Sequence, residues 1–351
     1  MKTGASTRRV FLQKSFLGTA GALAGWRTIH AAEGWPVEAS PAPTSRVALT
    51  AGNDRADNAF RALQMFRREI AAAIGQRRVI VKANLVSVTR LLAATHPDCL
   101  EGVLEFLKSI GKTNVIIAES SAEGLTMDGY AAFGYSRLPR QYPVRLMDLN
   151  QEEFEVMTIW NGAGTRTVRV SKVLLDPRHF VISVPRMKTH DCVVATLALK
   201  NIVMGAPMID VAYHRGRPGG SRNDKSPMHG TGNQDLNDNL HRLAPRLVPD
   251  LAVLDGFEGM EGNGPTGGTA VNHRVCVAGL DWLAAERVAV ELMGIPANYL
   301  AYLDYCHQTG LGEYDLAQIE VLGEPVADHI VTYRLHSNVS TQLNMRATPR
   351  T

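Results

Sequence analysis

The stretch VIVKANLV (residues 79–86) decides the fold of this chain. It is a short apolar run, rich in β-branched residues, that ends near polar Lys82 and Asn84, and the run NVIIAES (114–120) follows the same pattern. Such runs predict buried strands, and residues 97–110 between them predict a helix. A strand, a helix and a strand in this order favour two parallel strands joined by a crossover helix.

The same alternation continues on both sides of this unit. Upstream, RVALTAG (46–52) predicts a strand, and residues 57–74 predict a helix because their apolar side chains recur at helical spacing. Downstream, residues 144–178 are rich in strand signals, and strands and helices alternate again after a polar, glycine-rich loop (206–235). We expect an α/β fold of the doubly wound type, with a mostly parallel sheet, flanking helices and a β-rich insertion at about 144–178.

The domain organisation follows from length and composition. The chain has 351 residues, of which 45% are hydrophobic and 20% are charged, so it can bury a large core as one large domain or two smaller ones. No internal repeat or low-complexity tract is visible. We expect a single catalytic or binding domain over residues 46–325, followed by a C-terminal tail (326–351).

The N-terminus indicates export. Paired Arg8 and Arg9 precede the short, weakly apolar segment FLGTAGALAGW, which resembles a twin-arginine signal. The alternative is a basic amphipathic helix. We expect a signal over residues 1–32, a Pro/Ala/Ser-rich linker over 33–45, the twin-arginine export machinery as a partner, and a periplasmic or otherwise exported location. The apolar segment is too short for an ordinary membrane span, so membrane contact is expected only through the signal.

Charge and cysteine spacing exclude several kinds of site. The formal net charge is +3, and no central run of basic residues alternates with aromatics, so nucleic acid is not an expected partner. The four cysteines are far apart and form no CxxC pattern, so there is no iron–sulfur motif. A disulfide remains open, as do four buried apolar thiols.

Polar residues recur where the predicted strands end. These residues are Lys82, Asn84, Glu119, Lys188, His190, Asp255 and Glu258. Because the carboxyl ends of parallel strands meet at one edge of a sheet, we expect these side chains to surround a single polar site. The segment RMKTHDCVVATLALKN (186–201) adds Lys200 and Asn201 at a second approach to the same cleft.

Each of these residues also has a structural alternative. Lys82 can extend from a strand end into solvent, and Lys188 with His190 can form an exposed turn. His96 before Pro97 can cap the following helix, and Lys200 with Asn201 can lie on a solvated helix face. Solvent exposure is equally open for the carboxylate of Glu258.

The glycine-rich segment GMEGNGPTGG (259–268) raises the possibility of an anion-binding loop. It matches neither of the standard phosphate-loop patterns, but amides near Gly262 and Gly264 can hold an anion, and a purely structural turn is the alternative. Histidines offer a further possibility. His190 and His229 are candidate ligands of a transition metal, although no HxH or HExxH spacing supports them.

Several segments carry a resemblance to a known family. These are KANLV with His96-Pro97, AES, PRMKTH with TLALKNIVMG, KSPMH (225–229) and PDLAVLDGFEGMEGNGPTGG. In this order, over roughly residues 46–295, they resemble the motifs of the domain-of-unknown-function family 362. The resemblance implies an α/β fold and a shared polar site, without a particular reaction. Some relatives carry a ferredoxin-like cysteine-rich module that this chain lacks.

Two functions fit these patterns. The first is an exported, cofactor- or metal-dependent enzyme for a small anionic substrate, with redox or isomerisation chemistry. Lysines 82, 188 and 200 would hold the anion, His190 or His229 would ligate a metal or move protons, and Asp255 or Glu258 would complete the acid/base set. The second is a non-catalytic periplasmic protein that binds an anion or a metal in the same pocket. The identity of any cofactor stays open.

Overall fold

The computed structural model describes residues 44–217 and 219–344. The predicted signal (1–32) and nearly all of the predicted linker (33–45) therefore lie outside the described residues. Within the described ranges, no helix is long and apolar enough to cross a membrane.

Ten strands of the described residues form one sheet, and two more form a separate hairpin. The strands are β1 (Ser45–Ala51), β2 (Arg78–Ala83), β3 (Val115–Glu119), β4 (Val144–Asp148), β5 (Phe154–Asn161), β6 (Gly164–Ser171), β7 (His179–Val184), β8 (Arg186–His190), β9 (Val194–Thr196), β10 (Leu251–Glu261), β11 (Thr269–Gly279) and β12 (Ile319–Gly323).

Helices connect most of these strands. They are α1 (Arg55–Gln64), α2 (Arg67–Ile74), α3 (Pro97–Ser109), α4 (Thr126–Ala132), α5 (Lys172–Leu175), α6 (Ala198–Gly205), α7 (Val211–His214), α8 (Ser226–His229), α9 (Asn233–Leu243), α10 (Trp282–Leu292), α11 (Ala301–Gln308) and α12 (Val339–Asn344). The His96 imidazole accepts a hydrogen bond from the Asp98 amide and so caps α3, which begins at Pro97.

The sheet confirms the predicted fold class. Its order is β12-β1-β11-β10-β7-β2-β3-β4. The strands from β10 to β4 pair in parallel, β12 pairs in parallel with β1, and only β11 runs antiparallel to its neighbours β10 and β1 in this path. The structure is therefore a mostly parallel mixed sheet with flanking helices.

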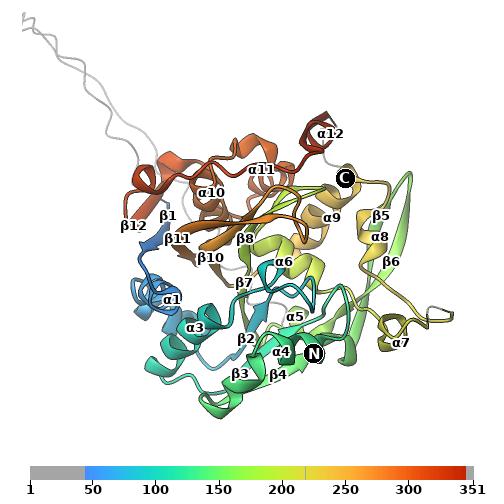
Figure 1. The fold of residues 1–351 in the computed structure, drawn as a ribbon, viewed down its shortest axis with the longest axis horizontal. Coiled ribbons are helices and arrows are strands. Elements are labelled where there is room, and N and C mark those ends of the chain that lie inside the picture. Colours follow the sequence, from blue (N-terminus) through green and yellow to red (C-terminus); the bar gives the residue numbers. More distant parts are fainter. Residues whose placement is uncertain (1–43, 218, 345–351) are drawn as a thin grey trace, which may run out of the picture. The chain divides into compact units, whose positions relative to one another are not determined.

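Successive side chains of a strand point alternately into two hydrophobic cores, one on each face of the sheet. In β2, Val79 and Val81 pack with α1, α2 and α3, whereas Ile80 packs with α6, α9, α10 and α11 on the other face. Figure 1 shows α1 and α3 beside one face of the sheet and α6, α9 and α10 beside the other. Because both faces are covered, these strands have almost no polar residues before their carboxyl ends.

The direction of chain progression reverses between β2 and β7. From β2 the chain proceeds through α3 to β3 and then to β4, whereas β7, on the other side of β2, leads through β8, β9 and α6 towards β10. Open α/β sheets bind ligands outside the carboxyl ends of the strands at such a reversal.

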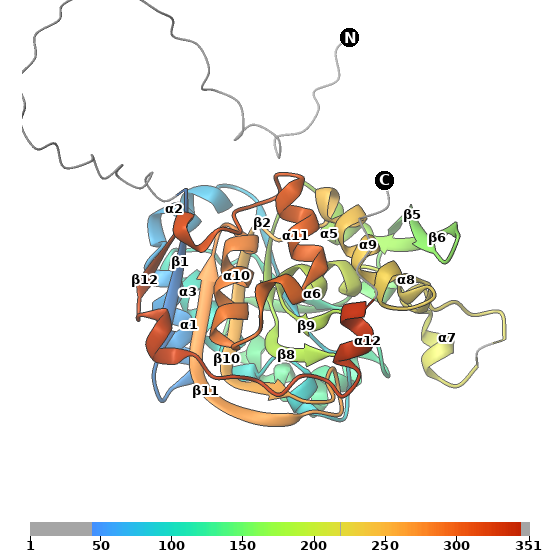
Figure 2. The same cartoon turned by 90° about the horizontal axis from the view of Figure 1, so that it is seen from above.

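The β-rich region divides into two parts. Strand β4 belongs to the main sheet, where it pairs with β3, and only β5 and β6 form a separate hairpin. The turn between them uses Gly162 at φ +66°, a conformation that suits glycine. Figure 2 shows this hairpin beside α8 and α9.

Several boundaries differ from the sequence predictions. The helix expected over 57–74 is broken at Met65-Phe66 into α1 and α2. The polar loop at 206–235 contains the short helices α7 and α8. Residues expected as a C-terminal tail pack on the domain, because the Tyr333 amide bonds to the Met293 carbonyl and Gln342 bonds to the backbone of His190 and Val194.

Candidate functional site

A cavity of about 210 Å³ with several polar side chains in its wall lies at the carboxyl ends of β2 and β3, beside α6. It is lined by Lys82, Asn84, Leu85, Val86, Glu119, Ser120, Ala122, His190, Asp191, Thr196, Lys200, Asn201, Met204, Gly205, Lys225, His229 and Pro265. The cavity is thus at the reversal between β2 and β7, and it brings together seven of the residues predicted from the sequence: Lys82, Asn84, Glu119, His190, Lys200, Asn201 and His229.

Lys82 and Glu119 form a buried ion pair at the base of the cavity. The Lys82 Nζ lies 2.5 Å from the Glu119 carboxylate and also donates to the Ala83 carbonyl. The same carboxylate accepts hydrogen bonds from the amides of Leu85 and Ser120. Burial lowers the pKa of Lys82, and Glu119 opposes that shift. Because both charges are paired within the protein, the two residues position the strand ends and leave little free charge for a ligand.

Asn201 joins the two strands that border the reversal. Its amide nitrogen donates to the Lys82 carbonyl and to the Ser183 hydroxyl, each at 3.1 Å. Its oxygen accepts from the Asn84 amide nitrogen at 3.1 Å and from Lys82 Nζ at 3.4 Å. Since both ends of the side-chain amide are engaged, Asn201 fixes α6 over the ends of β2 and β7.

Gly205 lets the end of α6 approach Lys82 closely. A Cβ at this position would lie 2.4 Å from both Cε and Nζ of Lys82. The glycine is therefore required by the packing of the ion pair.

Lys200 is the cavity amine without a partner. Its side chain is 6% exposed, and within the described residues its Nζ forms neither a hydrogen bond nor an ion pair. Burial lowers the pKa of Lys200 to about 8, against weaker opposing effects of Cys192 and Asp191. A buried amine of this kind is partly neutral near physiological pH and can act as a base, a nucleophile or an anion-binding group.

Lys225 brings a second buried amine to the cavity. Its Nζ donates to the Ser120 hydroxyl at 2.8 Å and to the Met204 carbonyl at 2.7 Å, both of which are uncharged. Burial lowers the pKa of Lys225 to about 7. Because no carboxylate bonds directly to it, an anion in the cavity would favour its charged form.

Two imidazoles complete the cavity wall. Burial lowers the pKa of His190 to about 3, and burial also lowers the pKa of His229. The Nδ1 atom of His190 accepts from the Cys192 amide and lies 3.0 Å from the Asp191 carboxylate. Both rings are therefore neutral at physiological pH.

Two further buried polar atoms of the cavity lining lack a hydrogen-bond partner in the described structure. They are Asn84 Oδ1 and Thr196 Oγ1, and both residues line the cavity. An unsatisfied buried acceptor or hydroxyl is costly, so these atoms are suited to bond to a ligand or to water in the cavity.

The comparison with protein families identifies the chain. Residues 79–291, more than half of its length, match the family described as Domain of unknown function (DUF362). The chain belongs to this family.

The chain is also similar, more distantly, to two other proteins. A thylakoid-associated protein of Synechocystis is 23% identical over 218 residues, which are 62% of this chain and 63% of that protein. The chain thus matches less than two thirds of that relative's length. A crystal structure of a Thermotoga maritima protein is 14% identical, with a TM-score of 0.37, over 66% of this chain and 58% of that one.

The DUF362 motifs include residues that sequence reasoning left out of the site. Lys225 opens the KSPMH motif and Ser120 ends the AES motif, but neither residue is among those that the sequence predicts for the site. Both residues stand in motifs that are visible in the sequence, but only the fold shows that their side chains come into contact at the cavity. Asp191 and Thr196, within RMKTHDCVVATLALKN, were likewise missed.

Glu286 was also missed, because it lies in an apolar helix far from every motif. Its carboxylate accepts hydrogen bonds from the Leu199 amide, at the start of α6, and from the Tyr302 hydroxyl. Burial raises the pKa of Glu286 to about 8. This residue of α10 positions the helix that carries Lys200.

Lys188 does not line the cavity, contrary to the prediction. The strand-like run HFVISVP is followed by a second strand, β8, so Lys188 lies within the sheet and not in a loop. Its Nζ donates to the Ala93 carbonyl at 2.8 Å, and burial holds its pKa well below the usual range. Lys188 is a buried structural amine.

Asp255 and Glu258 do not line the cavity either, contrary to the prediction that they follow the end of a strand. Strand β10 continues to Glu261, so both residues lie within a strand and not at its end. Asp255 lies 3.4 Å from Arg55 Nε, and Glu258 lies 3.4 Å from Arg186 Nη1. These carboxylates form a separate ionic cluster outside the cavity lining.

The glycine-rich segment (259–268) lies near the cavity, but the predicted residues Gly262 and Gly264 do not line it. Gly262 adopts φ +76°, and a Cβ on Gly264 would lie 2.0 Å from the Thr189 carbonyl oxygen. Gly264 therefore permits the close contact of the loop with β8, and the neighbouring Pro265 is the residue that reaches the cavity.

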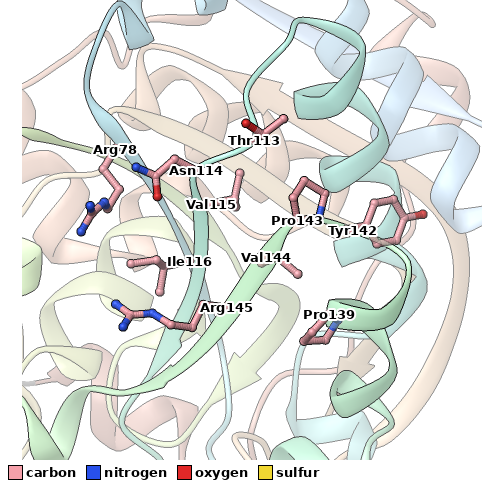
Figure 3. A pocket seen from close by; sticks show the side chains of 10 residues that line it. All are labelled: Arg78, Thr113, Asn114, Val115, Ile116, Pro139, Tyr142, Pro143, Val144 and Arg145. Carbon is pink, nitrogen blue, oxygen red and sulfur yellow. The ribbon is translucent and has the colours of Figure 1, made fainter.

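A larger, more open depression of about 420 Å³ lies at the opposite, amino ends of β2, β3 and β4. Figure 3 shows Arg78 and Arg145 on one side of it and Tyr142 and Pro139 on the other. Its polar groups do not converge as those of the smaller cavity do, so the smaller cavity is the better candidate site.

Proposed function

We propose that this chain is an enzyme that acts on a small anionic substrate bound in the cavity beside α6. The observation that carries the proposal is the pair of buried amines, Lys200 and Lys225, neither of which has a carboxylate as hydrogen-bond partner. Burying a cation without an anion is costly, so a bound carboxylate or phosphate would stabilise the charged amines.

Proton-transfer groups favour turnover over simple capture. An amine with a pKa of about 8 (Lys200) and two neutral imidazoles (His190 and His229) line one small cavity. Capture of an anion needs only the charge, whereas an acid and a base in reach of the same ligand allow a proton to be removed and returned. Removal of a proton and its return to another atom is the chemistry of an isomerisation, which we favour over redox chemistry on this ground.

Anion binding tests this proposal. Sulfate, acetate and pyruvate should each be titrated into the full chain by calorimetry, and we expect at least one to bind saturably. Lys200→Met and Lys225→Met should weaken binding at least tenfold, whereas Lys108→Met on the exposed face of α3 should leave it unchanged. The proposal fails if none of the three anions binds, or if binding is indifferent to both cavity lysines.

A non-catalytic metal- or anion-binding protein is the second candidate. One ligand atom each from His190, Asp191 and Cys192 lies within 4.8 Å of the others, and His229 lines the same cavity. A thiolate, an imidazole and a carboxylate suit a transition metal. However, burial and Asp191 raise the pKa of Cys192 to about 12, so the metal would have to displace a firmly held proton.

Metal analysis of the protein purified from its native host tests the metal site on which the second candidate rests. A stoichiometric transition metal that is lost in Cys192→Ser would favour the second candidate. If wild type and variant contain the same amount of metal, well below one ion per chain, the anion site alone is favoured, and His190, Asp191 and Cys192 do not form a metal site.

A further inference from the structure

The cavity's lysines differ in how far their amines are already engaged. Lys82 is paired with Glu119, and Lys225 donates to Ser120 and Met204. Among the described residues that line the cavity, Lys200 is the lysine whose Nζ has no bonding partner. It is held on α6, whose start is bound by Glu286 and whose middle is bound through Asn201 to β2 and β7.

We infer that Lys200 is a nucleophile, and that its amine condenses with a small carbonyl compound that carries an anionic group, such as a 2-oxo acid, to form an imine. This inference rests on the proposed function, because it assigns a substrate class to the same cavity. Lys225 would face the anionic group, and the cavity of about 210 Å³ limits the substrate to a few carbon atoms.

The chemistry balances with the groups present. The lone pair of the neutral Lys200 nitrogen attacks the carbonyl carbon, and the carbonyl electron pair moves to oxygen, which takes up a proton. The nitrogen then loses a proton, the oxygen takes up a second proton, and the nitrogen lone pair expels that oxygen as water. The protonated imine finally loses its remaining N–H proton, so the nitrogen gives up two protons and the water molecule carries two away. The products are an imine and one water molecule, and no oxidant or reductant is consumed.

A proton carrier for these steps lines the same cavity. His229 is neutral at physiological pH, so its ring can accept the proton that the nitrogen loses and return it to the leaving oxygen. Burial lowers the pKa of Lys200 to about 8, which provides neutral amine at a pH where an exposed lysine is almost fully charged.

Reductive trapping tests the inference. The full chain is incubated with pyruvate and sodium cyanoborohydride at about pH 7.5, where exposed lysines remain charged, and the adduct is located by peptide mass mapping. We expect one reduced adduct on Lys200, formed at least tenfold more than with acetone, which is an uncharged carbonyl compound of similar size. Lys108, an exposed lysine in the same samples, is the internal control.

Lys200→Arg separates this inference from the proposed function. Arginine keeps the positive charge but forms no such imine, so the variant should still bind acetate or sulfate while trapping at this position disappears. If wild type binds these anions but Lys200 is never trapped, or is labelled no more than Lys108, the imine inference is wrong and the anion site survives. If neither trapping nor anion binding occurs, both are wrong.

Discussion

Lys200 and Lys225 show how burial lowers the pKa of a lysine that has no carboxylate partner. Both side chains are 6% exposed, and burial lowers their pKa values to about 8 and about 7. Lys82 is even more deeply buried but has Glu119 as a counter-ion. Among the lysines that line the cavity, the structural one is therefore distinguished from the other two by a carboxylate within bonding distance.

Anion binding should be accompanied by proton uptake. An anion beside Lys200 and Lys225 raises both pKa values, so amines that are partly neutral in the free protein become charged. At about pH 7.5 we expect uptake of roughly one proton per anion bound, and at about pH 6, where both amines are already charged, close to none. Calorimetry of sulfate binding in buffers of different ionisation enthalpy measures this number.

The pH 6 titration serves as the internal control for that experiment. Proton release, or an uptake that is the same at both pH values, would mean that these two amines do not contact the anion.

Helix α6 is the element on which the site depends. It has only eight residues, seven of them buried, and so it cannot be stable by itself. Glu286 of α10 binds its first turn, Asn201 ties it to β2 and β7, and Gly205 lets its last turn lie against Lys82. These contacts stabilise α6, which is buried on nearly all sides, unlike a surface helix with one exposed polar face.

Gly205→Ala should destabilise the protein by about 1–3 kcal/mol, because the new methyl group would overlap Lys82 and push its amine away from Glu119. Urea unfolding monitored by circular dichroism measures the loss. Gly164→Ala is the matched control, since Gly164 is exposed and a Cβ there meets no atom within 4 Å. If both variants unfold at the same urea concentration, the close approach of α6 to Lys82 is not required.

At the scale of the whole molecule, two distant parts of the chain support one turn. Val194 has φ +63°, which is unusual for a β-branched residue, and it lies across from His190 in the β8–β9 hairpin. Gln342 of α12 accepts from the Val194 amide and donates to the His190 carbonyl. The C-terminal segment thus holds the turn that carries Asp191 and Cys192, and strained backbone of this kind is often found at functional sites.

Export concerns the entire chain, because the twin-arginine route carries proteins that are already folded. We propose that Arg8 and Arg9 direct the folded protein to the twin-arginine machinery, so Arg8→Lys with Arg9→Lys should retain at least nine tenths of it in the cytoplasm. Cell fractionation followed by immunoblotting measures the distribution. Lys14→Arg, which leaves the arginine pair intact, is the control, and normal export of the double variant would contradict the proposal.

The alternation of apolar runs and helical patterns by itself determined the parallel α/β arrangement, because burial of both sheet faces requires strands such as VIVKANLV to be apolar up to their ends. It also indicated Lys82, Asn84, Glu119, His190, Lys200 and Asn201 as neighbours, since the carboxyl ends of parallel strands share one edge. Their meeting in one cavity agrees with that reasoning.

Only the tertiary structure decided which polar residues are free to react. Sequence spacing does not show that β10 continues past Asp255, or that Lys188 lies in a second strand beneath the Ala93 carbonyl. Nor does it reveal that Glu119 neutralises Lys82 while Lys200 remains unpaired. Charge pairing depends on distances of a few ångströms between residues far apart in the chain, and those distances are set by how the helices pack on the sheet.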